Sequence, residues 1–370
     1  MIEYNRLVQN TFGIQTLAAA YVGFSCLEEL RELLEDSSLP RPFLFVGAGS
    51  NLLFTGDFPG TVFHSLMKGI RVVEGGAPCC KADDATGKSC MRDDVSGEVL
   101  VEVDSGVVFD DFCAWAAEKG FWGIENLSHI PGEVGASAVQ NVGAYGVEAK
   151  DVIVSVNCIE ISSGKAVAFS NTDCGYGYRA SNFKTVWKGR YAVTSVLFRL
   201  SSIPAPHLDY GHLRLAVEAK AAAAPEQSIT PSLIRETVTE IRREKLPEPA
   251  ELGSAGSFFK NPVVPQAHYE HILSDFRREN GPEATVPHYI IEHPEGTAPM
   301  VKIPAAWMIE QCGWKGKQTG NVACYSRQPL VIVNLTGKAT ATEIIELEQQ
   351  IIASVRNRFG VELHPEVEHI

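Results

Sequence analysis

The sequence has no surplus of basic residues, no pair of cysteines spaced C-x-x-C, and no apolar run near the roughly 18 residues that span a bilayer. Lys and Arg number 32 against 45 Asp and Glu, which gives a formal net charge of −13. A general nucleic-acid binder needs the opposite balance to neutralise phosphates. We therefore expect neither a nucleic acid nor a membrane as partner, although a few local cations can still hold a small anionic ligand.

The cysteines and the first residues indicate the compartment. Nine cysteines, an odd number, are scattered through 370 residues, which is typical of reduced thiols rather than of a disulfide framework. The opening segment MIEYNRLVQNTFGI has neither the basic nor the apolar region of a signal peptide. We expect a cytoplasmic protein.

The apolar periodicity predicts an α+β fold with mixed sheets. Ser25 and Glu28 are expected to form a capping box at the start of the first helix, and Thr340 with Glu343 at the start of the last one. Helices are predicted over 25–34, 109–119, 231–243, 304–312 and from 340 to Gly360. Strands are predicted at the start of 42–54 and over 99–103, 152–161, 191–200, 329–335 and 361–367.

Two segments lack such periodicity. Residues 74–97 are rich in Gly, Asp and Cys, and we expect a non-catalytic surface excursion there. Residues 219–226 are rich in alanine and are expected to form a linker between lobes.

Two familiar kinds of site are not supported. Thr86 to Ser89 ends like a phosphate-binding P-loop, but position 82 is Ala where the motif needs Gly. His364, Glu366 and Glu368 would share one face of the predicted last strand, yet a proline stands among them and no further cluster is obvious. We expect no metal.

Two glycine-rich runs, at 45–52 and at 130–146, suit a large cofactor that carries phosphates. Glycines let the backbone approach a ligand closely, and successive N–H groups form a nest for an anion. The first run is not a G-x-G-x-x-G fingerprint because position 52 is Leu. Each run alone also fits an irregular structural turn. The cofactor-binding residues expected from the two runs are Gly47, Gly49, Ser50, Asn51, Leu52, Pro131, Gly132, Gly135, Ala136, Ser137 and Gly143.

Two further runs carry reactive side chains. Arg179 lies among aromatic residues in GYGYRASNFK, where a guanidinium could grip a carboxylate through two hydrogen bonds. Ser257 lies between small and bulky apolar residues in GSAGSFFKNP. That run does not match the G-x-S-x-G elbow of hydrolases, but a hydroxyl on a rigid turn can donate a proton. A structural turn is the alternative for either run.

Together and in this order, these runs resemble the UDP-N-acetylenolpyruvoylglucosamine reductase family. The similarity covers nearly the whole chain except 74–97 and 219–226. It rests on NTFGI at 10–14, GAGSNLLF, MKGI at 67–70, GIENLSHIPGEVGASAVQNVGAYG, YGYRASNFK, REKLPEP, GSAGSFFKNP, KIPAAWMIEQCGWKG and the closing HPEV. Nine ordered motifs are far more specific than any one of them.

The resemblance implies FAD bound between two N-terminal lobes of the vanillyl-alcohol-oxidase-like (PCMH) type, and a C-terminal α/β lobe that binds substrate. The implied lobes span 1–68, 69–201 and 227–360, and the strand 361–370 is a possible completion of the first. The implied reaction is NADPH-dependent reduction of the enolpyruvyl group of UDP-N-acetylglucosamine enolpyruvate to UDP-N-acetylmuramate, a peptidoglycan precursor.

The resemblance also implies residue roles. Arg179 and Glu366 would stabilise the charge that builds on the substrate carboxylate, Glu366 only if it is protonated or bridged through Arg179. Ser257 would donate the proton. Tyr210 and Lys245 match a subgroup with a tyrosine loop and would contact the diphosphate and uridine region. Further substrate contacts expected on weaker grounds are Tyr145, Asn261, Lys302 and Gln318.

Two other readings compete. One is an oxidase or dehydrogenase with the same FAD lobes and another substrate, which would need no lobe for a UDP-sugar. The other is a binding protein without turnover, in which one of Arg179, Ser257 and Glu366 would be missing, whereas all three are present. We expect a monomer.

Overall fold

The computed structural model describes residues 2–73, 97–223, 228–291 and 298–370. The expected excursion, through residue 96, and the P-loop-like Thr86 to Ser89 lie outside the described residues. The described chain forms two compact units. The first unit comprises Met1–Arg6, Ala18–Ala48 and Pro59–Arg242, and the second unit comprises Leu7–Leu17, Gly49–Phe58 and Arg243–Ile370. The lobe boundaries drawn from the sequence stay a prediction.

A four-stranded sheet and one helix open the first unit. The sheet has the order β1 (Ile2–Leu7), β2 (Leu17–Phe24), β5 (Phe58–Ser65) and β3 (Phe43–Phe45). Helix α1 (Leu27–Glu35) buries three leucines in a core shared with Phe24 and Phe63. The strand predicted before the first glycine-rich run is therefore β3, which pairs parallel with β5.

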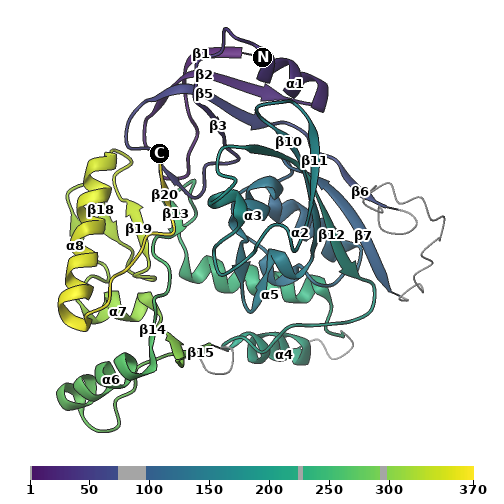
Figure 1. Ribbon diagram of the computed structural model, residues 1–370. Helices are drawn as coiled ribbons and strands as arrows, with labels where there is room; N and C mark the ends of the chain where they lie inside the picture. The colour runs from purple at the N-terminus through teal and green to yellow at the C-terminus, as the bar shows by residue number, and fades with distance from the viewer. Residues whose placement is uncertain (1, 74–96, 224–227, 292–297) are drawn as a thin grey trace. The chain divides into compact units, whose positions relative to one another are not determined.

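A five-stranded antiparallel sheet forms the centre of the first unit. Its order is β11 (Ala166–Ser170), β10 (Ile153–Glu160), β12 (Tyr191–Ser201), β7 (Glu98–Asp104) and β6 (Ile70–Val72). Helices α2 (Phe109–Glu118) and α3 (Val134–Gln140) cover one face, as Figure 1 shows. Because side chains alternate along a strand, Val101 and Val103 enter this core while Glu102 and Asp104 lie on the opposite face.

Smaller elements complete the first unit. A short hairpin, β8 (Gly143–Ala144) and β9 (Val147–Glu148), follows α3. Helices α4 (Leu213–Ala223) and α5 (Pro231–Lys245) share a separate apolar cluster with Trp122 and Leu208. Thr230 caps α5, since its hydroxyl accepts the backbone N–H of Leu233.

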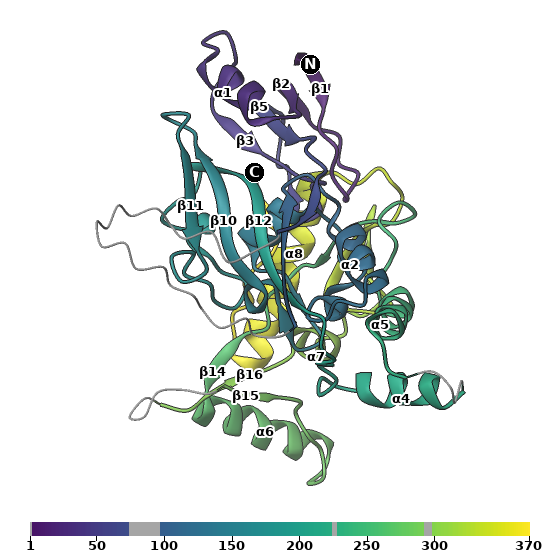
Figure 2. The same cartoon turned by 90° about the vertical axis from the view of Figure 1, so that its right-hand side faces the viewer.

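The second unit contains a mixed α/β core. One sheet has the order β13 (Gly253–Ser257), β19 (Val331–Asn334), β18 (Val322–Cys324) and β17 (Gln318–Thr319), and a second has β14 (Val263–Pro265), β16 (Met300–Lys302) and β15 (Tyr289–Ile291). Helix α6 (Gln266–Asn280) lies beside the second sheet (Figure 2). Helices α7 (Ala305–Gln311) and α8 (Ala341–Phe359) pack into one core, and β20 (Glu368–His369) pairs parallel with β4 (Leu52–Leu53).

Of the two helix caps predicted from the sequence, one is confirmed and the other is shifted by one residue. Thr340 and Glu343 form the predicted capping box of α8, and Gly360 ends the helix in the left-handed conformation. At α1 the predicted cap is wrong by one residue. The Sγ of Cys26 accepts the N–H of Glu29, and the Glu29 carboxylate accepts the N–H of Ser25.

Two other expectations are wrong. The linker expected over 219–226 begins inside α4, which continues to Ala223 because alanine is the strongest helix former, and residues 224–226 lie outside the described residues. The last strand is not 361–367 but Glu368–His369. Pro365 makes only an isolated bridge to Phe259, since proline has no N–H for a ladder. His364, Glu366 and Glu368 therefore do not share the face of one strand.

Within the described ranges, no helix combines the length and the apolar character that crossing a membrane would require.

Candidate active site

Arg179 lies in a strained turn of the first unit. Gly177 and Ala180 exchange two backbone hydrogen bonds of 3.0 and 3.1 Å, which leaves Tyr178 and Arg179 at the tip of a tight hairpin. Arg179 has φ +52°, a left-handed conformation that costs a residue with a Cβ roughly 1–2 kcal/mol. Its Nη2 donates to the carbonyl of Gly143 at 3.0 Å. Strain of this kind concentrates at functional sites.

Tyr145 lies in a second strained turn of the same unit. The β8–β9 hairpin turns at Tyr145 and Gly146, which have φ of +49° and +83°. Burial raises the pKa of Tyr145, so its phenol stays protonated near neutral pH. The Tyr145 ring lies edge-on to that of Tyr210, with centroids 6.1 Å apart. The structure therefore brings together two of the residues expected to contact substrate.

A buried asparagine holds both tyrosine segments. Asn126 is 1% exposed, and its Nδ2 donates to the carbonyls of Tyr145 and His207 at 2.9 and 2.8 Å. The sequence analysis assigned no role to Asn126, because nothing in the sequence indicates that its two acceptors are neighbours.

Gly47, at the start of the first predicted cofactor loop, lies close to Glu133 of the second loop within the first unit. A Cβ on Gly47 would lie 3.0 Å from Oε2 of Glu133, so only glycine fits there without a shift. Gly132 has φ +121°, a conformation that is essentially restricted to glycine. Both loops thus have the bare backbone that a phosphate-bearing cofactor needs, and the residues fit FAD.

Glu133 at this junction is buried and paired. Its Oε1 lies 2.9 Å from Nε2 of His64 and 3.5 Å from Nζ of Lys68, and the carboxylate side chain is 7% exposed. Nδ1 of His64 in turn lies 2.8 Å from the hydroxyl of Tyr21. The sequence analysis missed this network, since Glu133 stood out only as one letter within a glycine run.

The end of β7 supports the second cofactor loop. The N–H of Gly135 donates to the carbonyl of Ser105 at 2.9 Å, and a Cβ on Gly135 would lie 2.8 Å from the Cβ of Ser105. The hydroxyl of Ser105 donates to Ser65 at 2.9 Å. The carboxylate of Asp104, the residue before Ser105, accepts the N–H of Gly69 at 2.8 Å. Gly135 is therefore required by packing against β7.

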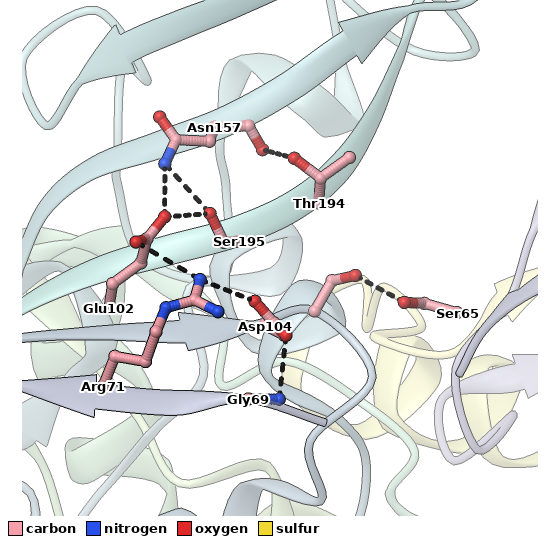
Figure 3. Close-up of polar contacts among 9 residues, drawn as sticks. Ser65, Gly69, Arg71, Glu102, Asp104, Asn157, Thr194 and Ser195 are labelled. Carbon is pink, nitrogen blue, oxygen red and sulfur yellow. Dashed lines mark hydrogen bonds and ion pairs between the residues drawn. The ribbon is translucent and has the colours of Figure 1, made fainter. Parts of the chain in front are cut away.

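A polar network fixes this end of β7 (Figure 3). It lies on the face of the five-stranded sheet opposite helices α2 and α3. Arg71 reaches both Glu102 and Asp104, at 3.3 and 3.2 Å. Oε1 of Glu102 accepts hydrogen bonds from Asn157 and from Ser195. Four strands are tied together in this way, which gives the loop at Gly135 a rigid base.

The segment before Pro131 is anchored by an ion pair. Asp110 accepts two hydrogen bonds from the guanidinium of Arg235, at 2.7 and 3.0 Å, and one from the N–H of His129. Burial by itself would raise the pKa of Asp110, but these hydrogen bonds outweigh it and lower that pKa. His129 has φ +59°, so a strained residue is held directly before the cofactor loop.

In the second unit, Ser257 and Glu366 lie on neighbouring segments. The N–H of Glu366 donates to the carbonyl of Phe258 at 2.8 Å, and Ser257 directly precedes Phe258 at the end of β13. Nδ2 of Asn51 donates to the carbonyl of Glu366 at 3.1 Å. The structure thus brings together a predicted proton donor, a predicted acid and a residue of the first glycine-rich run.

Gly49 is required by packing within the second unit. It has φ +64°, and a Cβ would lie 2.6 Å from the carbonyl oxygen of Gln9. Its own carbonyl accepts the N–H of Thr11 at 3.3 Å, while the carbonyl of Thr11 accepts the N–H of Ser254. The NTFGI motif therefore links the first glycine-rich run to the strand that carries Ser257.

The remaining predicted substrate residues of the second unit are dispersed. Oδ1 of Asn261 accepts the N–H of Ala305 at 2.9 Å, which gives it a structural role at the start of α7. Lys302 lies on β16 with Nζ 5.7 Å from the ring centre of Tyr289. Gln318 is exposed on β17, and Lys245 is exposed at the end of α5.

Comparisons with known proteins agree with these features. A family model described as FAD binding domain matches residues 18–170. A model described as UDP-N-acetylenolpyruvoylglucosamine reductase, C-terminal domain, matches residues 248–370. The chain thus has an α+β fold in which a PCMH-like FAD-binding domain precedes a C-terminal domain.

Two relatives of known name match this chain over nearly the full length of both sequences. The chain is 42% identical over 368 residues to UDP-N-acetylenolpyruvoylglucosamine reductase of Bacteroides fragilis strain YCH46, covering 100% of this chain and 99% of that protein. It is 40% identical over 371 residues to the enzyme of the same name from Porphyromonas gingivalis strain ATCC 33277, covering 100% and 98%.

A solved structure supports the fold. The crystal structure of UDP-N-acetylenolpyruvylglucosamine reductase from Thermus caldophilus is similar with a TM-score of 0.61 at 20% identity, covering 100% of this chain and 99% of that one. With this fold, both domain models and full-length relatives at 40–42% identity, the chain belongs to the UDP-N-acetylenolpyruvoylglucosamine reductase family.

Proposed function

We propose that Arg179, Ser257 and Glu366 carry the reduction of the enolpyruvyl group of UDP-N-acetylglucosamine enolpyruvate in this chain. The chain is an FAD-dependent oxidoreductase of its family, with NADPH as the hydride donor and a UDP-sugar as substrate. The chemistry that bound FAD supplies is hydride transfer, from NADPH and then to the terminal carbon of the enol ether. The product is UDP-N-acetylmuramate, a peptidoglycan precursor.

The protein's own residues handle charge and the proton. Hydride addition to the terminal carbon pushes an electron pair toward the substrate carboxylate, and a cation placed there in advance lowers the barrier. The guanidinium of Arg179 suits that task because its turn is fixed and its planar fork can bind a carboxylate through two hydrogen bonds. The hydroxyl of Ser257 then gives its proton to the carbon that bears the carboxylate.

One observation of geometry supports this assignment most. The N–H of Glu366 hydrogen-bonds the carbonyl of Phe258, so two residues far apart in sequence are held on adjoining segments beside Asn51. Glu366, on the segment that adjoins the one carrying Ser257, would stabilise with Arg179 the charge that builds on the substrate carboxylate. The alternative, an oxidase with another substrate, is not favoured, because the C-terminal domain model and full-length relatives match this family.

The cofactor and substrate contacts are proposed on the same basis. The backbones of 47–52 and 131–137 would hold FAD, as supported by the contact between Gly47 and Glu133. Tyr145 and Tyr210 would contact the UDP-sugar together, as supported by their edge-on rings. Lys245, Lys302 and Gln318 stay predictions, and Asn261 has a structural contact that can account for it alone.

Separate measurement of the two half-reactions tests the roles. Ser257→Ala should be reduced by NADPH at close to the wild-type rate, because that hydride transfer needs no serine proton. Its reoxidation by the enolpyruvyl substrate should fall at least about 10²-fold. Ser354→Ala is the matched control, since its hydroxyl only bonds the carbonyl of Gln350 within α8. An unchanged reoxidation rate in Ser257→Ala would remove this residue from the mechanism.

We also propose that the protein is a monomer in the cytoplasm. The free thiols of Cys113, Cys158, Cys174 and Cys324, all buried, support a reducing compartment. Light scattering on the purified protein checks the monomer, which a dimer mass would contradict. Fractionation of the producing cells checks the location, which recovery outside the cytoplasmic fraction would contradict.

A further inference from the structure

The buried side chain of Asn141 joins three segments of the first unit. Asn141 ends α3 with φ +48° and is 0% exposed. Its Nδ2 donates to the carbonyl of Gly177 and to Oε2 of Glu148, both at 2.9 Å, and its Oδ1 accepts the N–H of Lys150 at 3.0 Å. Both N–H donors of the amide group and one lone pair of its oxygen are directed at these three partners.

These bonds hold the turn that carries Arg179. The carbonyl of Gly177 accepts from Asn141 and also from the N–H of Ala180, so both of its acceptor positions are used and its direction is fixed. The guanidinium of Arg179 is held by the carbonyl of Gly143, two residues beyond Asn141. One short stretch of chain therefore holds both the backbone and the charged end of Arg179.

The conformations of the two residues support a functional reason for this arrangement. Asn141 and Arg179 both have a positive φ although neither is glycine. Asparagine adopts this conformation readily at the end of a helix, whereas at Arg179 such strain persists only where the surroundings over-determine the backbone. A second tie, from the hydroxyl of Ser181 to the carbonyl of Val139 at 2.6 Å, joins the same two segments.

We propose that Asn141 is a positioning residue for Arg179 in the reduction of the enolpyruvyl group, a role that rests on the proposed function of Arg179. Asn141 does not touch substrate in this account. It fixes the peptide at Gly177, and thereby the place of the guanidinium relative to the substrate carboxylate. A displacement of about 1 Å at a reacting group can lower a rate by up to about 10²-fold.

A paired substitution can release the Gly177 carbonyl, although it also removes the ion pair between Glu148 and Lys150. Asn141→Asp combined with Glu148→Gln exchanges the donor and the acceptor between the two side chains and keeps their summed charge. The new amide at 148 can donate to the new carboxylate at 141, which still accepts the N–H of Lys150. The Gly177 carbonyl then lacks its side-chain donor. Asn280→Ala is the control, because its side chain donates to the carbonyl of Phe276 within α6, away from this hairpin.

The readout is a double-mutant cycle with Arg179→Ala, measured on the reoxidation of the reduced enzyme by the enolpyruvyl substrate. The paired substitution should slow reoxidation about tenfold in the wild-type background and less than twofold in the Arg179→Ala background. FAD content and the rate of reduction by NADPH should match those of wild type. Asn280→Ala should leave both half-reactions within about twofold.

The experiment distinguishes a failure of the positioning role of Asn141 from a failure of the proposed function of Arg179. An equal loss in both backgrounds, or a parallel loss of FAD, would show that Asn141 acts only on folding and would overturn the proposal. No loss in the wild-type background would overturn it as well. A fully active Arg179→Ala would refute the proposed function of Arg179 and with it this inference, whereas an impaired Arg179→Ala beside an unaffected paired variant would refute the positioning role alone.

Discussion

The left-handed conformation of Arg179 makes a stability prediction that can be separated from catalysis. At an ordinary position, glycine is less stable than alanine by roughly 0.5–1 kcal/mol because it loses more backbone entropy on folding. At φ +52°, alanine instead bears a penalty of roughly 1–2 kcal/mol that glycine avoids. The difference predicts that Arg179→Gly is more stable than Arg179→Ala by about 1 kcal/mol. Both variants lose the same bond to Gly143, so that loss cancels.

Arg31 supplies the matched control. It lies inside α1, and its Nε donates to the carbonyl of Gly164 at 3.1 Å, much as Arg179 donates to Gly143. Because Arg31 is helical, the order should reverse there, with the glycine variant less stable than the alanine variant by about 1 kcal/mol.

Thermal unfolding of the four variants at one fixed FAD concentration measures both differences, since bound cofactor shifts the apparent stability. A difference of 1 kcal/mol corresponds to about 2–4 °C in a unit of this size. Arg179→Gly and Arg179→Ala should both lose reoxidation by the enolpyruvyl substrate, by at least about 10²-fold. An alanine variant at 179 as stable as, or more stable than, the glycine variant would refute the strained turn.

Three further predictions test other parts of the site. Tyr210→Phe should raise KM for the UDP-sugar about tenfold, roughly 1.4 kcal/mol, and leave reduction by NADPH unchanged; an unchanged KM contradicts the tyrosine-loop assignment. Gly47→Ala places a Cβ 3.0 Å from Glu133 and should lower the flavin content of folded protein, and full occupancy would show that the loop is only structural. Since the folded-state pKa of Asp110 is lowered, its stabilisation should be complete above the ordinary carboxyl pKa and be lost as pH falls through the folded value. Asp110→Asn should therefore unfold earlier than wild type at pH 7 and approach it as the pH falls below the ordinary carboxyl pKa, whereas a difference independent of pH would contradict the ion pair with Arg235.

The local signals in the sequence were sufficient for much of the scaffold. The capping box of Thr340 and Glu343 and the stop at Gly360 mark α8, because caps depend only on residues within one turn. The last strand was mispredicted because the alternation around Pro365 resembles a strand, while a missing N–H prevents the ladder. At α1 the neighbouring residues Ser25 and Cys26 could both serve as caps, and periodicity does not distinguish a shift of one residue.

The sequence identified the residues of the candidate site as separate runs, but it did not indicate how these runs are arranged in space. Arg179 and Ser257 could be named because their residue types suit the chemistry. Their support could not be named, since Asn141 reaches Gly177 and Glu133 reaches His64 only through the tertiary fold. Close packing within the protein also requires glycine at 49 and at 135, and the contact of these two residues with FAD stays a prediction.

The most direct test of the central claim is an anaerobic titration followed by its visible spectrum. The purified protein should show the absorption of oxidised flavin, which NADPH bleaches. Addition of UDP-N-acetylglucosamine enolpyruvate should restore that absorption and yield one UDP-N-acetylmuramate for each NADPH consumed. A protein that binds flavin and accepts hydride from NADPH, but is not reoxidised by this substrate, would contradict the account.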